Sequence, residues 1–317
     1  MIRIEAGLFI MLVGIVFFYN YRKRDMTGSE LLKYFRSRVV YILIPYILWS
    51  LIYEVDALYF NTREFDIPTI ISNILTGKSM YHLHFISLIV QFYLLFPIFL
   101  LIIQKSALLR KYLWIFGVLA EFGYYLLNLK YGFTSGPLFL TILSPFLLGA
   151  WIGLHYEKVA EQATKFNSAL FGFLFLLTGI LDVLIRYESI FHGVNIISPE
   201  MQKLLNLAFL MVGGIFFFFL SEQLVKNFKN SNVEKVKRIA YYSFGFYLVH
   251  PFIITRINMY LPLQDSGLSW HAMFILHYVL VIVICYFTIW GFHRFMAYSS
   301  YLFGKLPKKA VLFWKAS

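Results

Sequence analysis

Nine long apolar runs constrain this chain more than any other feature of its sequence. Each is about 17 to 25 residues long, which is the length that a helix needs to cross roughly 30 Å of hydrocarbon. They lie near residues 4–20, 39–60, 83–104, 112–128, 138–156, 168–186, 204–221, 239–260 and 272–296. Connecting segments reach only about 22 residues, so we expect one membrane domain over residues 1–317 and no separate soluble domain.

The composition points to the same class of protein. Hydrophobic residues make up 60% of the chain and charged residues only 14%, against roughly 25% charged residues in a typical soluble domain. Such a chain cannot cover a water-exposed surface, so its main partner is the lipid bilayer and no nucleic acid is expected. The single cysteine, Cys285, excludes an intramolecular disulfide. The expected fold class is an all-α polytopic transmembrane helical bundle with about nine spans.

The distribution of Lys and Arg predicts an orientation. Of the 28 Lys and Arg residues, 21 lie in one set of alternate loops and six in the other, and Arg256 lies inside a span. Loops rich in Lys and Arg stay in the cytoplasm. We therefore expect the amino terminus outside and the carboxyl terminus in the cytoplasm.

Ionisable residues within spans are candidates for a functional site, because each costs at least about 2.5 to 3.5 kcal/mol on insertion scales. Under the predicted orientation most of them lie in the outer half of the membrane. These are Glu54, Asp56, His82, His84, Asp182, His250, Arg256 and His277. They could form a polar chamber that opens to the outside. Alternatively, those near a span end reach the lipid headgroups and have no further role.

The loop before the second span carries a basic cluster. It consists of Arg22, Lys23, Arg24, Lys33, Arg36 and Arg38. Such a cluster could hold a phosphate-rich ligand through charge-assisted hydrogen bonds, or it could only bind anionic lipid and set the topology. No soluble active-site motif is present in the sequence, and the i, i+2 spacing of His82 and His84 argues against a metal site.

Three segments together resemble the acyltransferase 3 family of membrane acyltransferases. Residues 33–49 (KYFRSRVVYILIPYILW) resemble the family's basic entry to a span. Residues 81–86 (YHLHFI) and 91–97 (QFYLLFP) resemble its His-Leu-aromatic-Phe segment and the Gln-Phe-Tyr continuation. Residues 243–251 (SFGFYLVHP) resemble its late Tyr-Leu-x-His-Pro element. The chain is most similar to the Gram-positive branch that includes intercellular-adhesin polysaccharide modification or export proteins.

This resemblance implies transfer of an acyl group, usually acetyl, from cytoplasmic acyl-CoA to a sugar hydroxyl outside. Acyl-CoA would be a donor substrate, and no bound cofactor is expected. By resemblance Arg38 sits at the family's cytoplasmic arginine motif, with Arg36 beside it, but Tyr41 stands where a second arginine is usual. The family's usual first span, with an arginine and the histidine regarded as the catalytic base, has no counterpart, because residues 4–20 resemble the second span.

The resulting hypothesis is a multi-pass acyltransferase of a bacterial plasma membrane that O-acylates a surface or lipid-linked glycan of the cell wall. We expect His82 as the catalytic base and His250 as the second candidate, since imidazole titrates near neutral pH. Glu54, Asp182 and Arg256 are the candidates for acceptor binding. The alternatives are a polysaccharide exporter without a covalent step and a non-catalytic partner subunit of another membrane protein.

Overall fold

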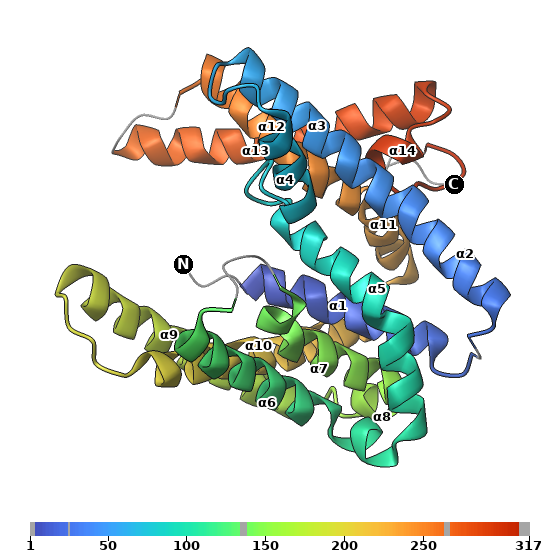
Figure 1. Ribbon diagram of the computed structural model, residues 1–317, viewed down its shortest axis with the longest axis vertical. Helices are drawn as coiled ribbons and strands as arrows, with labels where there is room; N and C mark the ends of the chain where they lie inside the picture. Colours follow the sequence, from blue (N-terminus) through green and yellow to red (C-terminus); the bar gives the residue numbers. More distant parts are fainter. Residues whose placement is uncertain (1–3, 25, 134–137, 263–266, 311–317) are drawn as a thin grey trace. The chain divides into compact units, whose positions relative to one another are not determined.

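The computed structural model describes residues 4–24, 26–133, 138–262 and 267–310, and every regular element in these ranges is helical (Figure 1). The chain forms two compact units, which are described one at a time. Unit 1 comprises Met1–Thr27 and Leu88–Phe228, and unit 2 comprises Gly28–Ser87 and Lys229–Ser317. The expectation of a single domain stays a prediction.

Six helices in the described residues are long and apolar enough to cross a membrane. They are Gly28–Tyr59, His84–Lys105, Ala107–Tyr131, Lys165–Phe191, Pro199–Asn227 and Trp270–Phe295. Shorter apolar helices cover Ala6–Tyr21, Ile67–Thr76 and Phe139–Leu154. The predicted class, an all-α polytopic membrane protein, is confirmed. The predicted span 239–260 corresponds to a helix that carries His250 and Arg256 and is not among the six, so the count of nine and the orientation stay predictions.

Unit 1 consists of helices from the first and middle parts of the chain. They are α1 (Ile4–Tyr21), most of α5 (His84–Lys105), α6 (Ala107–Tyr131), the 3₁₀ turn η2 (Phe139–Ile142), α7 (Leu143–Leu154), α8 (Tyr156–Glu161), α9 (Lys165–Phe191) and α10 (Pro199–Asn227). Polar residues begin the long helices: the side chains of Ser106, Thr164 and Ser198 each accept a hydrogen bond from a backbone N–H in the first turn of α6, α9 and α10.

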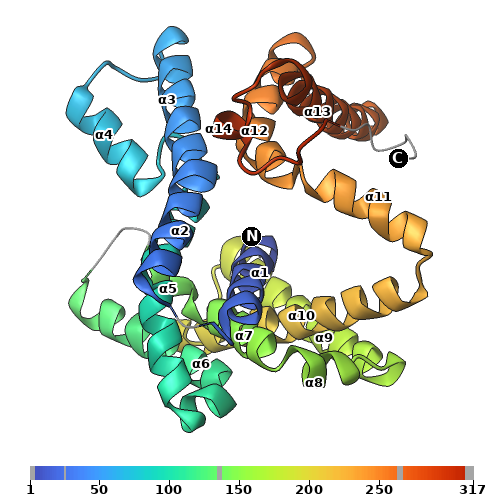
Figure 2. The same ribbon diagram turned by 90° about the vertical axis from the view of Figure 1, so that its right-hand side faces the viewer.

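Helix α1 lies along α7, as Figure 2 shows, and glycines allow this close approach. A Cβ atom added at Gly149 would collide with the Met11 carbonyl oxygen, and one at Gly14 with the Phe146 carbonyl oxygen. Gly153, one turn after Gly149, likewise faces the α1 backbone. Small residues four apart let two membrane helices pack backbone to backbone, where van der Waals contact drives association.

A buried ion pair joins α6 and α10 inside unit 1. Glu121, which is 1% exposed, accepts a hydrogen bond from Lys203 Nζ at 2.6 Å. Its other oxygen accepts from the backbone N–H of Ser144 at 2.9 Å and from the Ser144 hydroxyl at 2.6 Å. The central carboxylate of the fourth predicted span is thus paired within the bundle, as a buried charge must be.

Unit 2 contains the remaining helices. They are α2 (Gly28–Arg38), the π-helical turn η1 (Val39–Leu43), α3 (Ile44–Tyr59), α4 (Ile67–Thr76), α11 (Asn230–Ala240), α12 (Ser243–Tyr260), α13 (Leu268–Phe295) and α14 (Ser300–Phe303). α2, η1 and α3 form one continuous helix of 32 residues. Pro45 has no backbone N–H to donate to the carbonyl four residues earlier, and its ring crowds that carbonyl. These two effects account for the wider π-helical turn before it.

Aromatic side chains hold α3 against its neighbours in unit 2. The Trp49 indole donates a hydrogen bond to the Leu302 carbonyl at 2.9 Å, which ties α3 to α14. The Tyr53 hydroxyl donates to the Leu248 carbonyl at 2.8 Å, which ties α3 to α12. Helix α12 packs in turn against α13 and α14 (Figure 2). Residues of α3 and α12 about 200 positions apart in sequence therefore face each other.

Candidate functional site

Two histidines of unit 2 lie side by side. His82 precedes α5 and His250 lies on α12, and their ring centroids are 5.3 Å apart. The rings of Tyr53 and Tyr247 lie 5.5 Å and 5.1 Å from that of His82. Both predicted catalytic histidines thus belong to one cluster, which we call the histidine cluster: His82, His250, Tyr53 and Tyr247.

Backbone groups fix the orientation and tautomer of His250. Its Nδ1 lies 3.0 Å from the carbonyl oxygen of Phe246 and 2.9 Å from that of Tyr247. Because carbonyl oxygens only accept, Nδ1 carries the proton and Nε2 keeps its lone pair. An imidazole oriented through one nitrogen, with the other free to accept a proton, has the arrangement of a general base.

His82 is more deeply buried than its neighbour. It is 3% exposed, and neither ring nitrogen makes a hydrogen bond of good geometry to a described group. The Tyr247 hydroxyl donates to the His82 backbone carbonyl and so fixes the segment that carries the ring. Burial lowers the pKa of His82 to about 3; the nearby His250 adds to this shift, and the Leu248 backbone partly offsets it. His82 is therefore neutral at physiological pH.

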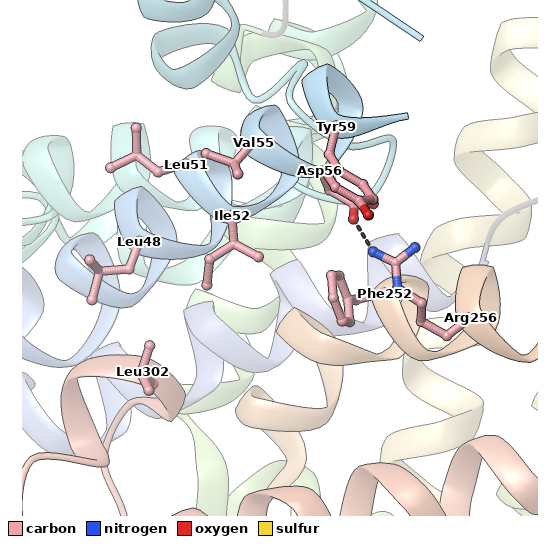
Figure 3. A pocket seen from close by; sticks show the side chains of 9 residues that line it. All are labelled: Leu48, Leu51, Ile52, Val55, Asp56, Tyr59, Phe252, Arg256 and Leu302. Carbon is pink, nitrogen blue, oxygen red and sulfur yellow. Dashed lines mark hydrogen bonds and ion pairs between the residues drawn. The ribbon is translucent and has the colours of Figure 1, made fainter. Parts of the chain in front are cut away.

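A cavity of about 530 Å³ lies beside the histidine cluster, between α3, α12 and α14 (Figure 3). Its wall is apolar except for an ion pair at one end, in which the Arg256 guanidinium donates to the Asp56 carboxylate. The other lining residues are Leu48, Leu51, Ile52, Val55, Tyr59, Phe252 and Leu302. Phe252 connects the two features, because its ring lies 6.4 Å from that of Tyr53. The volume is within the range of small-molecule sites.

Arg256 is held by aromatic rings as well as by Asp56. Its guanidinium carbon lies 4.5 Å from the centre of the Phe252 ring and 4.8 Å from that of Phe60. Stacking of this kind holds the face of the guanidinium against the aromatic ring, and the N–H groups at its edge remain available for hydrogen bonds. The arrangement can therefore bind an anionic or hydroxyl-bearing group at the polar end of the cavity.

The other two predicted acceptor residues make ion pairs of their own. Glu54 is 3% exposed and accepts from Arg63 Nη1 at 2.7 Å, while Arg63 Nη2 donates to the Lys78 carbonyl at 3.1 Å. Asp182 belongs to unit 1, is fully buried, and accepts from Arg186 Nε at 2.8 Å. Its second oxygen, Oδ1, has no hydrogen-bond partner in the part of the chain that the structure describes. Neither residue lines the cavity of Figure 3.

The two predicted CoA-binding arginines lie at the last turn of α2. The Arg38 guanidinium stacks 4.3 Å from the centre of the buried Tyr34 ring, and Arg36 is exposed. Tyr53 lies 15 positions after Arg38 on the same helix, a distance of about 22 Å at 1.5 Å per residue. The arginines and the histidine cluster therefore lie toward opposite ends of one membrane-length helix, since the hydrocarbon core is roughly 30 Å thick.

Sequence reasoning missed the tyrosines and Phe252, which surround the histidines. A signal for Tyr247 existed, because residues three apart lie on one helix face and Tyr247 precedes His250 by three. No local signal could assign Tyr53, whose contacts with α12 arise from packing. Within the described ranges, no group of three or more His, Cys, Asp or Glu side chains could hold a metal ion.

A family model described as "Acyltransferase domain" matches residues 2–294, so the chain belongs to the acyltransferase 3 family. Relatives from Staphylococcus aureus strains MSSA476 and MRSA252 are 25% identical over 271 residues, which cover 82% of this chain and 71% of each relative. Both are named "Probable poly-beta-1,6-N-acetyl-D-glucosamine export protein". The predicted family is confirmed, and these names agree with the predicted branch. No solved structure gives a significant match.

Proposed function

We propose that this membrane protein transfers an acyl group, most simply acetyl, from acyl-CoA to a hydroxyl group of a cell-surface polysaccharide. The observation that carries the proposal is the histidine cluster beside an amphiphilic cavity, in a chain of the acyltransferase 3 family. Acyl transfer to a hydroxyl needs a base for the hydroxyl proton. His250 supplies one, because its Nδ1 is fixed by backbone carbonyls and its Nε2 accepts no hydrogen bond from the part of the chain that the structure describes.

In the proposed reaction, His250 Nε2 accepts the proton of the acceptor hydroxyl while its oxygen attacks the thioester carbonyl carbon. The carbon–sulfur bond then breaks, and the CoA sulfur leaves with the proton that His250 releases. Neutral His82 packs against the His250 ring and is the second candidate for a proton acceptor. Its low pKa makes it a poor proton acceptor near neutral pH, because a base with a pKa far below the operating pH takes up a proton poorly.

The donor is proposed to bind at the other end of the α2–α3 helix. Exposed Arg36 and stacked Arg38 offer guanidinium groups that match phosphate oxygens in bidentate geometry. The long acyl-pantetheine arm of CoA would then follow the helix toward the histidine cluster. In the predicted orientation this places the CoA phosphates on the cytoplasmic side of a bacterial plasma membrane and the acceptor outside.

The acceptor is proposed to bind at the cavity of Figure 3. Its polar end, with Arg256 and Asp56, suits sugar hydroxyls or a phosphate, and its apolar wall suits a lipid carrier of the glycan. The names of the relatives favour an N-acetylglucosamine polymer as the glycan class. Glu54 and Asp182 remain proposed acceptor residues, but neither lines this cavity, and each already pairs with an arginine of its own unit. A partner membrane subunit is a further proposal.

The proposal is tested by reconstituting the full chain in vesicles with radiolabelled acetyl-CoA and a β-1,6-linked N-acetylglucosamine oligosaccharide. Removing a general base typically lowers the rate about 10² to 10⁴-fold, so His250→Ala should lose transfer by this factor. His82→Phe keeps an aromatic ring of similar size but removes both nitrogens. It should retain transfer if His82 only packs, and lose it if His82 is the base.

The control is His192→Ala, since His192 is exposed in unit 1, where its ring pairs with Glu188 and lies against the Tyr187 ring. This variant should transfer acetyl groups at the wild-type rate. Full activity of His250→Ala would refute the assigned base. If circular dichroism shows that the wild type is folded but it transfers no acetyl group, the proposed reaction is refuted.

Arg38→Ala tests the donor site independently of the chemistry. A hydrogen bond to a charged group contributes about 1.5 to 3 kcal/mol, so loss of one guanidinium should weaken acyl-CoA binding about tenfold or more. Calorimetric titration of the detergent-solubilised protein measures this change. Lys235→Ala is the control, because Lys235 is exposed on α11 and lies outside the basic cluster before the second span. Equal affinities for Arg38→Ala and the wild type would contradict the assignment.

Export of a polysaccharide is the second candidate function, and the names of the relatives favour it. An exporter would move the labelled oligosaccharide across the vesicle membrane without acyl-CoA and without a covalent change. Mass spectrometry of the oligosaccharide separates the two functions. An added acetyl group of about 42 Da indicates transfer, whereas translocation at unchanged mass indicates export.

A further inference from the structure

A second cavity, in unit 1, has the lining of a site for an amphiphilic anion. Its volume is about 510 Å³, and it lies between α6, α7, α8, α9 and α10. The polar side chains of its lining are Lys111, His155, Lys158 and Gln162, together with the indole of Trp151. No Asp or Glu is among the nine residues that line it. The lining of the cavity therefore carries positive charge and no acidic side chain.

The two lysines of the rim are available to a ligand. Lys158 and Lys111 are both exposed, and no ion pair is formed by either one within the described residues. The nearest acidic residue in sequence, Glu157, is already taken, because Arg22 donates to both of its oxygens, at 2.8 Å and 2.5 Å. The Lys111 ammonium lies 5.0 Å from the centre of the Tyr112 ring.

The inner wall of this cavity is apolar and well packed. Val159 and Phe219 belong to a buried cluster of unit 1, and Phe171 and Ile215 pack against that cluster. Trp151 stands at the edge between the two regions. Its indole nitrogen donates to the Lys111 carbonyl at 3.1 Å, at the point where Tyr112 interrupts the α6 helix. The cavity thus combines a cationic rim, a tryptophan at the boundary and a hydrocarbon-like wall.

These parts gather at one end of the unit 1 bundle. The start of α6, the end of α7, the short helix α8, the first turns of α9 and the second half of α10 all contribute to the lining. This end carries two of the loops that the Lys and Arg distribution predicts to be cytoplasmic, residues 105–111 and 157–167. Anionic lipid is enriched on that face of a membrane, and tryptophan favours the headgroup region.

We propose that this cavity binds one anionic glycerophospholipid, with its phosphate between Lys111 and Lys158 and an acyl chain along Val159, Ile215 and Phe219. The charge of the rim matches the phosphate, and the wall matches the chain. The cavity is large enough to surround a headgroup and the upper part of a chain, since small-molecule sites have about 300 to 1,000 Å³. This lipid site is independent of the acyl-transfer proposal, because every lining residue belongs to unit 1.

The test measures lipid retention by native mass spectrometry of the full chain from nanodiscs of phosphatidylcholine and phosphatidylglycerol. The wild type should retain one phosphatidylglycerol in preference to phosphatidylcholine. Each lysine near anionic lipid is expected to contribute about fivefold in affinity, so Lys111→Gln with Lys158→Gln should weaken retention by about fivefold or more. Lys165→Gln is the control: it removes the same charge from the same predicted side, and Lys165 does not line the cavity.

A second variant tests the apolar wall without a change of charge. Ile215→Trp should fill part of the cavity and reduce retention of phosphatidylglycerol, while circular dichroism reports whether the helices persist. Equal retention of both lipids by the wild type, or unchanged retention in the double lysine variant, would overturn the proposal. Displacement of the lipid by an equal concentration of inorganic phosphate would also overturn it, because the site would then recognise phosphate alone.

Discussion

The Glu121–Lys203 ion pair of unit 1 gives a sharp test of how burial controls the energy of a charge. The perturbation is Lys203→Met, which keeps the length of the side chain and removes its ammonium. Glu121 is 1% exposed, so water cannot replace the lost partner. The two hydrogen bonds from Ser144 remain, and the carboxylate stays buried next to them without a counter-charge.

Removal of one partner from a buried ion pair costs about 3 to 5 kcal/mol, because the remaining charge is left desolvated. We expect the apparent melting temperature of the detergent-solubilised Lys203→Met protein to fall by several degrees. Adding Glu121→Gln should restore most of the loss, because the amide oxygen can still accept from Ser144 and no charge is left buried. The single variants and the double variant form a cycle that isolates the pair.

The matched control is Lys237→Met, whose partner Glu234 lies at a similar distance of 2.8 Å but on the surface, with side chains 61% and 57% exposed. Its melting temperature should hardly change, since water solvates both groups. Equal effects of Lys203→Met and Lys237→Met would refute the reasoning, because burial would then not determine the energy. If adding Glu121→Gln to Lys203→Met does not restore stability, Lys203 stabilises the protein through packing and not through its charge.

Three further predictions follow from other parts of the chain. Gly149→Ala should lower the melting temperature, because overpacking against the α1 backbone costs about 1 to 3 kcal/mol. Gly123→Ala is the control: its added Cβ meets no atom within 4 Å, so it should raise the melting temperature slightly. The pKa of His82 is about 3 in the folded protein and 6.5 in the unfolded chain, so the unfolded chain takes up the proton first. Stability should therefore fall as the pH drops from about 6.5 toward 3, by up to about 1.4 kcal/mol per pH unit, and His82→Phe should remove this part of the dependence in melting curves recorded across that range. A reporter fused after Ser317 should be active only in the cytoplasm and one near Gly136 only outside; activity of both on one side would contradict the predicted orientation.

Much of the candidate site could be named from the sequence, but not its arrangement. His82 and His250 stand out because an ionisable residue in or beside an apolar run is rare, and the structure brings them into ring contact. The pairing of Asp56 with Arg256 was not predictable, because the two residues are 200 positions apart and only the packing of α3 on α12 joins them. The burial of His82 was not predictable either. Its position at a span end suggested an open mouth, and its burial arises from neighbouring rings.

The sequence by itself determined the class of the protein. A bilayer requires every backbone polar group to be bonded within its own segment, so runs of about 20 apolar residues can only become helices. That requirement is local and can be read from one run at a time. Tertiary structure alone decided which polar groups meet. Glu121 and Lys203 lie 82 positions apart, and the close contact of Gly149 with Met11 depends on how α7 packs against α1. Such contacts depend on side-chain packing between helices, and the apolar pattern within one helix is compatible with many partners.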